Sequence, residues 1–183
     1  MPSLTIPTLT NVRLRLEPLS PAHSAGMFAL WSRAEVCRYS GPAIDAFGDP
    51  IRLSAVTPLD SDRILDYFVR RAAAGLGFRW ALITRSDNRF VGALGFNHLS
   101  ACPELAYHLH PDAWGAGLMT EAARRALDWL AAAHHARQVQ AFIEPANSAS
   151  IALAERLGFA ATGEVVEGAA RYVASLRGTQ GTV

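Results

Sequence analysis

The stretch that decides the fold is HPDAWGAGLMTEA, residues 110–122, where two glycines lie between an expected strand and an expected helix. Glycine lets the backbone approach a ligand closely, and a helix start offers free N–H groups and a positive dipole. Together they predict an anion site suited to a pyrophosphate. A glycine turn used only for tight packing is the alternative. Position 120 is Thr120 and no lysine follows, so the stretch is neither a Rossmann fingerprint nor a P-loop.

A second stretch, NSASIALAERLGF at residues 147–159, follows one expected helix and one expected strand later. The pair P-x-x-W-G-x-G-x-x-T-E-A and N-x-x-S-x-x-L-x-E-x-x-G-F resembles the GNAT superfamily of N-acetyltransferases. Within that superfamily it is most similar to the branch with the Rim-type acetyltransferases, which act on ribosomal-protein N-termini. The resemblance covers roughly residues 11–177.

Hydrophobic alternation, helical periodicity and turn residues predict the other elements. Strands are expected at 12–16, 78–84, 90–97, 104–110, 138–143, 159–165 and 171–176. Helices are expected from Ser20-Pro21, from a cap at Asp60 or Ser61, over 118–133 and over 148–157, with a long loop at 40–59. Three successive strands make an antiparallel meander, and the later strand–helix–strand crossover requires a parallel pair.

The expected fold class is therefore α/β (α+β). It is a single-domain, GNAT-like mixed sheet of about seven strands, with an antiparallel meander, a parallel splayed pair, and helices on both faces. One domain is expected over residues 1–183, with its core at about 11–177.

The resemblance implies acetyl-coenzyme A held between splayed strands at 104–110 and 138–143. Backbone groups of the glycine stretch would hold the pyrophosphate, the strand end would pair with the pantetheine arm, and the second motif would flank the thiol. The cofactor-binding residues implied in this way are Leu109, His110, Trp114, Gly115, Ala116, Gly117, Leu118, Met119, Thr120, Asn147 and Ser150.

Two positions depart from the family pattern. Asp112 stands where the family usually has Gln or Arg, which a contact made by backbone tolerates. Ala154 stands where many members have a Tyr that protonates the leaving thiolate. Ser150, or a water that it holds, is the expected substitute. A free thiol has a pKa near 8.5, so the acid is less needed than for a more basic leaving group.

The candidate base is Glu104, which begins the strand at 104–110 and matches a Glu that acts through water in some GNAT enzymes. A strand-end Glu facing solvent is the alternative. Glu104, Ala106, His108 and His110 alternate onto one face. His108 and His110 are interpreted as a proton relay, as substrate contacts or as ordinary strand histidines. No third ligand accompanies them, so no metal is expected.

The composition excludes several other chemistries. All seventeen basic residues are Arg, so no P-loop lysine, pyridoxal Schiff base or lysine nucleophile exists. Sixteen acidic residues leave a net charge of +1, which does not suggest nucleic-acid binding. The spacing of Cys37 and Cys102 fits neither a disulfide framework nor a zinc site. There is no signal segment and no membrane-length apolar run, so a cytoplasmic protein is expected.

The expected function is acetyl transfer from acetyl-coenzyme A to a primary amine, by direct attack in a ternary complex. The partner would be a small-molecule amine or a peptide N-terminus, and a homodimer is possible. An acidic segment between Asp45 and Asp66 predicts a rim that attracts a cationic amine, with a solvated loop as the alternative. A non-catalytic coenzyme A-binding module and a mixed α/β interaction protein without cofactor are the other interpretations.

Overall fold

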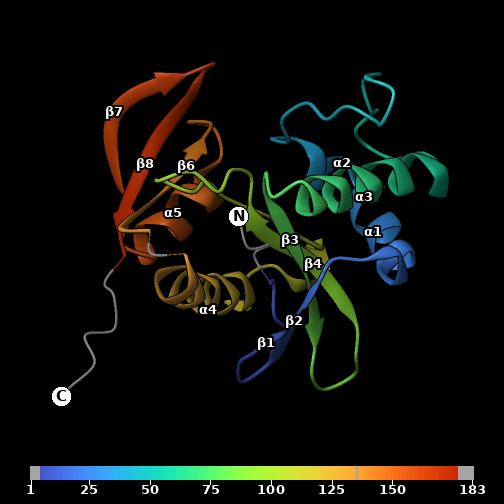
Figure 1. Ribbon diagram of the computed structural model, residues 1–183, viewed down its shortest axis with the longest axis horizontal. Coiled ribbons are helices and arrows are strands. Elements are labelled where there is room, and N and C mark those ends of the chain that lie inside the picture. Colours follow the sequence, from blue (N-terminus) through green and yellow to red (C-terminus); the bar gives the residue numbers. More distant parts are fainter. Residues whose placement is uncertain (1–4, 135, 177–183) are drawn as a thin grey trace.

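The computed structural model describes residues 5–134 and 136–176, and over these ranges it contains eight strands and five α-helices (Figure 1). The strands are β1 (Leu9–Thr10), β2 (Leu14–Pro18), β3 (Phe78–Thr84), β4 (Phe90–Phe96), β5 (Leu105–Leu109), β6 (Gln138–Ile143), β7 (Ala160–Val166) and β8 (Ala169–Ser175). The α-helices are α1 (Ser24–Trp31), α2 (Ala34–Cys37), α3 (Pro58–Ala73), α4 (Leu118–Ala133) and α5 (Ser148–Arg156). There are also two short 3-10 helices. η1 (Pro21–His23) directly precedes α1, and η2 (Pro111–Ala113) precedes the two glycines of the 110–122 stretch.

The first five strands form one antiparallel sheet in chain order, which includes the predicted meander of β3, β4 and β5. Aromatic rings fill the centre of one face of this sheet. Phe78 and Trp80 of β3 pack edge-to-face on Trp129 of α4, with ring centroids 5.5 and 5.1 Å apart. Such edge contacts stabilise more than area burial alone. They fix α4, and with it the glycine stretch that precedes α4, against the sheet.

Helices cover both faces of the five-stranded sheet, as expected. On one face, α4 buries Ala122, Ala126 and Leu130 in the larger core. On the other face, α1 and α3 form a second core around Met27 and Ile64. All seven residues of β3 are buried because the strand is covered on both sides. Among the described helices, none combines the length and the apolar character that crossing a membrane requires.

The remaining strands form a second sheet, in the order β6-β8-β7. It meets β5 through one parallel bridge between Glu104 and Gln140, where the Gln140 N–H donates to the Pro103 carbonyl at 2.9 Å. The mixed α/β architecture is confirmed, with the strands divided between two sheets rather than in one continuous sheet. The division follows from the splay itself, because β5 and β6 are not paired beyond the bridge (Figure 1).

The start of α3 lies earlier than the sequence suggests. Thr57 is the N-cap, its side chain accepts from the Asp60 N–H at 3.3 Å, and the Asp60 carboxylate accepts from the Thr57 N–H at 2.8 Å. This is a capping box followed by Pro58 at the first helical position. The prediction of Asp60 or Ser61 as the cap was therefore wrong, because Asp60 is the return partner and Ser61 is buried inside the helix.

Candidate active site

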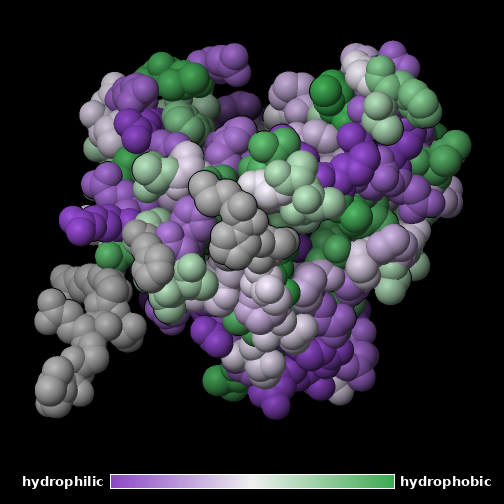
Figure 2. All heavy atoms as spheres, viewed as in Figure 1, coloured by the Kyte–Doolittle hydropathy of each residue, from purple (hydrophilic) through white to green (hydrophobic). Residues whose placement is uncertain are grey.

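An open cavity of about 2090 Å³ occupies the space where β5 and β6 diverge. Figure 2 shows a hollow in the surface between the part that carries β7 and β8 and the part that carries α2 and α3. The cavity wall contains most of the site residues predicted from sequence: Glu104, Leu109, Trp114, Gly115, Gly117, Leu118, Met119, Thr120, Asn147 and Ser150. The two other predicted residues, His110 and Ala116, are engaged elsewhere, as described below.

The glycine stretch forms a cradle at one end of the cavity. Gly115 and Gly117 have φ of 72° and 75°, a left-handed conformation that residues with a side chain rarely adopt. Gly117 is the N-cap of α4 and supplies no side-chain cap to the helix. The N–H groups from Leu118 to Thr120 therefore remain available at the positive end of the helix dipole. A Cβ at Gly115 would meet no atom within 4 Å, which is the open approach that a pyrophosphate requires.

Arg13 closes this end of the cavity from a distant part of the chain. Its main-chain N–H and Nε donate to the Glu121 carboxylate at 2.9 and 2.7 Å, and its Nη1 donates to the Ala116 carbonyl at 2.9 Å. Ala116 thus anchors the glycine turn to Arg13. Arg124 and Arg125 of α4 also line the cavity. The cationic side chains make this end favourable for an anion.

The free edge of β5 faces β6. The N–H groups of Glu104 and His110 donate to β4 and the loop that follows it, at His98 and Val91. By the alternation of an antiparallel ladder, the backbone groups of Leu105, Tyr107 and Leu109 point the other way, into the splay.

The last residues of β5 are held by the turn that follows. Trp114 Nε1 donates to the Leu109 carbonyl at 2.8 Å, and the Asp112 N–H donates to Nδ1 of His110 at 3.3 Å. The backbone N–H of His110 points to β4 and its ring caps η2. The structure therefore gives His110 a part in building the turn, outside the cavity wall.

The start of α5 forms the opposite wall. Asn147 is the N-cap, and its side chain accepts from the Ser150 N–H at 3.2 Å. Ala154 is buried one turn further along the helix. Tyr107 of β5 reaches this wall: burial raises the pKa of its phenol, and the adjacent Ser150 side chain opposes that rise. Ser150 and Tyr107 therefore form a pair of hydroxyl groups, of which sequence reasoning identified only Ser150.

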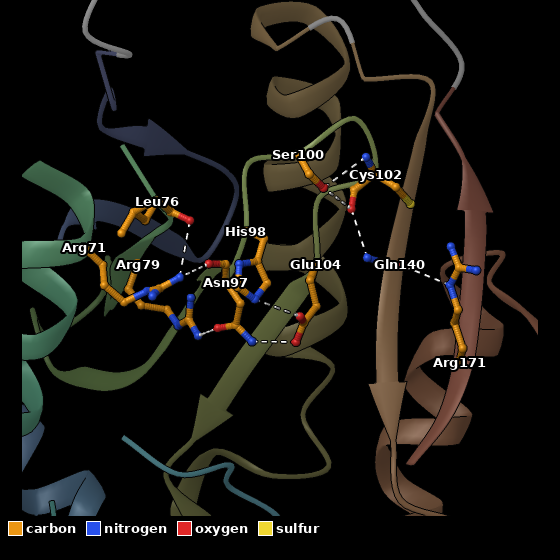
Figure 3. A network of polar contacts seen from close by, with 10 residues as sticks. All are labelled: Arg71, Leu76, Arg79, Asn97, His98, Ser100, Cys102, Glu104, Gln140 and Arg171. Atoms are coloured by element: carbon orange, nitrogen blue, oxygen red, sulfur yellow. Dashed lines mark hydrogen bonds and ion pairs between the residues drawn. The ribbon is translucent and has the colours of Figure 1, made fainter. Parts of the chain in front are cut away.

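Glu104 lies beside the bridge at which β5 and β6 separate. Its Oε1 accepts from Asn97 Nδ2 at 2.6 Å, and its Oε2 lies 3.8 Å from His98 Nε2 (Figure 3). The Glu104 side chain is 18% exposed and the His98 side chain is 63% exposed. The carboxylate therefore lies between a half-buried amide and an exposed imidazole, which differs from a strand-end Glu that faces only solvent.

A buried arginine lies behind Asn97. Nη2 of Arg79 donates to Asn97 Oδ1, and Nη1 donates to the Phe78 carbonyl at 3.0 Å. Burial lowers the pKa of Arg79 to about 10, and the nearby Glu104 charge acts in the opposite direction. At neutral pH the guanidinium therefore keeps its charge. Its carbon lies 4.6 Å from the centre of the Phe68 ring, a cation–π contact that also stabilises the charged form.

His108 lies in the cavity wall, beside Trp31 and Ser40. Its ring packs on Trp31 with centroids 4.5 Å apart, and its Nε2 lies 2.9 Å from Ser40 Oγ. Burial, followed by the charge of Arg79, lowers the pKa of His108 to about 3. His108 is therefore not suited to carry a proton as a stable cation near pH 7, which leaves two of the sequence alternatives, a substrate contact or an ordinary strand histidine.

Several other groups have structural partners. The Asp45 carboxylate pairs with Arg63 and accepts from the Phe47 and Asp49 N–H groups at 2.9 and 3.0 Å, so it orders its own loop. Burial raises the pKa of the Cys37 thiol to about 11, which makes it a poor nucleophile. Over the described ranges, no group of three His, Cys, Asp or Glu side chains is placed to hold a metal ion.

Comparison with known proteins agrees with this geometry. The family model described as "Acetyltransferase (GNAT) domain" matches residues 13–160. An uncharacterized N-acetyltransferase p20 of Bacillus licheniformis is 26% identical over 155 residues, covering 83% of this chain and 82% of that protein.

Two solved structures share the fold. The structure of RimL, an alpha-N-protein acetyltransferase of a ribosomal protein, in complex with coenzyme A has a TM-score of 0.73 at 16% identity and covers 92% and 97% of the two chains. RimJ of Mycobacterium smegmatis, in complex with a coenzyme A disulfide, has a TM-score of 0.68 at 20% identity and covers 88% and 81%. The family model, which spans most of the chain, places this protein in the GNAT acetyltransferases, enzymes that transfer acetyl groups from acetyl-coenzyme A.

Proposed function

We propose that this enzyme acetylates a primary amine by direct attack on acetyl-coenzyme A in a ternary complex, with Glu104 as the base. The observation that carries the proposal is the position of Glu104. It lies in the wall of the same cavity as the glycine cradle, at the point where β5 and β6 begin to diverge. One open space thus holds an anion cradle, a free strand edge and a carboxylate.

Each part of the site has a separate task. The cradle at Gly115 to Thr120 binds the pyrophosphate, and the free edge of β5 pairs with the pantetheine arm. Bound acetyl-coenzyme A supplies a thioester carbon that a neutral amine can attack. The substrate ammonium group must lose a proton to become the attacking amine, and Glu104 accepts that proton directly or through one water. A base at this step contributes about 10²–10⁴-fold to the rate.

Protonation of the leaving thiolate is assigned to Ser150. The N–C bond forms, the C–S bond breaks, and the released thiolate takes a proton from the Ser150 hydroxyl or from a water held there. The Tyr107 phenol stays protonated at neutral pH because burial raises its pKa, so it can restore the Ser150 proton and then regain its own proton from solvent water. This pair of hydroxyls supports a protonation route although position 154 is alanine.

The acceptor is proposed to be a small-molecule amine or a protein N-terminus. The name of RimL, an alpha-N-protein acetyltransferase, supports the second class. The free thiols of Cys37 and Cys102 are compatible with the reducing cytoplasm as its compartment. In the acidic segment, the Asp45 carboxylate is paired with Arg63 and is therefore not a free anion for a cationic acceptor.

An acceptor screen tests the function. Acetyl-coenzyme A is offered with peptides that have free N-termini, with polyamines and with amino acids, while thiol release and the mass of each acceptor are recorded. We expect a mass gain of one acetyl group on an amine, matched by an equal amount of released coenzyme A. Tight coenzyme A binding without turnover of any acceptor would favour the non-catalytic module instead, an alternative that Ala154 motivates.

A further inference from the structure

We propose that Asn97 is a positioning residue that determines which oxygen of Glu104 accepts the proton. The proposal rests on the role of Glu104 as the base. Asn97 holds Oε1 of Glu104 through its amide N–H, so that Oε2 remains free on the side of His98 and the cavity. The amide also stands between Glu104 and the buried Arg79 guanidinium (Figure 3).

The orientation of the Asn97 amide follows from its partners. A guanidinium only donates hydrogen bonds, so the atom that faces Arg79 must be the amide oxygen. The amide nitrogen then points to Glu104 and donates to it at 2.6 Å. If the amide oxygen and nitrogen changed places, the NH₂ group would meet the Arg79 donors and the oxygen would meet the Glu104 carboxylate. Arg79 therefore fixes Asn97, and Asn97 fixes Glu104.

The main chain holds Asn97 on both sides as well. Its N–H donates to the Glu104 carbonyl at 2.8 Å, and its carbonyl accepts from Nη2 of Arg71 at 2.5 Å. Arg79 in turn is only 5% exposed and is packed on Phe68. The amide is therefore presented from a rigid support, as a preorganised site requires.

A neutral spacer has a chemical purpose at this position. A guanidinium in direct contact with a carboxylate strongly favours its ionised form, which weakens it as a base. With Asn97 between them, Glu104 receives one hydrogen bond in place of a full ion pair. The carboxylate is oriented and can still take a proton.

The free oxygen faces an exit to solvent. Oε2 of Glu104 lies 3.8 Å from the exposed ring of His98. Arg79 of β3 is the charged group behind this carboxylate, and Arg71 and Tyr67 of α3 act in turn on Arg79. On the side of the second sheet, Arg171 is directed to Gln140 and Glu164. His98 is thus the exposed titratable group beside Oε2.

The substitution Asn97→Asp tests the proposal. It keeps an acceptor for Arg79 but places a negative charge where the donor to Glu104 was, which favours protonated Glu104. We expect the acid limb of the pH–kcat profile to move up by about one pH unit, so that kcat falls about ten-fold at any pH on that limb. Activity should recover as pH rises, and KM for acetyl-coenzyme A should not change. A merely structural role would lower activity equally at every pH.

Two variants provide controls. Asn97→Ser replaces the amide N–H with a shorter hydroxyl side chain and adds no charge, so it should displace the acid limb in the same direction by less. Asn88→Asp makes the same chemical change at another asparagine whose amide oxygen faces an arginine, Arg15, at 3.3 Å. Asn88 lies in the β3–β4 turn, away from any carboxylate of the cavity, so the pH profile should remain that of the wild type.

The double variant Asn97→Asp with Glu104→Gln separates this inference from the proposed function. If Asn97 acts through Glu104, adding Asn97→Asp to Glu104→Gln costs little further activity, because residues that act as a unit are not additive. Wild-type activity in Glu104→Gln alone would overturn the base and the inference together. An impaired Glu104→Gln beside an unchanged Asn97→Asp would overturn the inference only.

The acceptors for these assays are n-butylamine and a short peptide amide with a free N-terminal serine. Titration of the Glu104 carboxylate in the free protein, followed by NMR, gives a readout that needs no acceptor. Its midpoint should lie at higher pH in Asn97→Asp and Asn97→Ser than in the wild type. An unchanged midpoint in both would contradict the proposal.

Discussion

The two ends of the cavity are built in different ways. The cofactor end consists mainly of backbone N–H groups from one continuous stretch, residues 110–122, which begins at the end of β5 and runs into α4. The proposed catalytic end, around Glu104, consists of side chains from α3, β3 and the β4–β5 connection: Arg71, Arg79, Asn97 and Glu104. Local backbone geometry determines the first end, and tertiary packing determines the second. The two ends should therefore respond differently to substitution.

The largest effect is expected at the cofactor end. Gly117→Glu forces a side chain into a left-handed position with φ of 75° and puts a negative charge at the cradle. Binding of coenzyme A, measured by calorimetry, should fall below detection, and turnover should fall with it. Gly163→Glu, at another left-handed glycine with φ of 83° and outside the cavity wall, is the matched control for strain. Unchanged affinity of Gly117→Glu for coenzyme A would show that the cradle does not bind the pyrophosphate.

The next effect is expected at the catalytic end. Glu104→Gln keeps the shape of the side chain and removes its basicity. We expect kcat to fall by about 10²–10⁴-fold, with KM for acetyl-coenzyme A unchanged. The pH–rate profile should also lose its acid limb. If binding of coenzyme A falls with kcat, the two ends are not independent and the comparison fails.

A smaller effect is expected at Ser150, between the two ends. A thiolate with a pKa near 8.5 as a free thiol needs little help to leave, so Ser150→Ala should reduce kcat by only about ten-fold. Tyr107→Phe should reduce it less, and the double variant should resemble Ser150→Ala if Tyr107 acts through Ser150. Single-turnover thiol release measures this step. Full additivity of the two changes would show that the hydroxyls act separately.

The same contrast explains what could be predicted from the sequence. The motifs at residues 110–122 and 147–159 are each contiguous, so the glycine turn and the starts of α4 and α5 could be located before the structure. The core strands were also located well, because each carries its own alternation or turn signal. Residues 78–84, predicted as a strand, form β3 with the same bounds.

The network behind Glu104 left no comparable signal in the sequence. Arg79 occurs inside a strand pattern, and only the register of β3 with β4 brings it to Asn97. Arg13 and Glu121 are 108 residues apart in the chain, so their contact also depends on tertiary packing. The division into two sheets was not predicted, because the point at which β5 and β6 stop pairing depends on tertiary packing. In the acidic segment, composition alone does not show that Asp45 pairs with Arg63, whereas the rim itself stays a prediction.

The smallest effect on catalysis is expected at Asp45, which belongs to neither end. Arg63 first, together with the Asp49 and Phe47 N–H groups, lowers the pKa of Asp45 to about 2. A carboxylate whose pKa is lowered by folding stabilises the folded state at any pH above its unfolded-state pKa, which is near 4. This contribution is lost as the pH falls through the folded-state pKa of about 2.

Asp45→Asn should therefore lower Tm slightly at pH 7, and the difference from wild type should shrink as the pH is brought down toward 2. If Asp45 only orders its own loop, KM for a cationic acceptor should stay unchanged. Asp49→Asn is the matched control, since only its main-chain groups take part in the loop. A higher KM for a cationic amine in Asp45→Asn, without a loss of stability, would restore the acidic rim as part of the acceptor site.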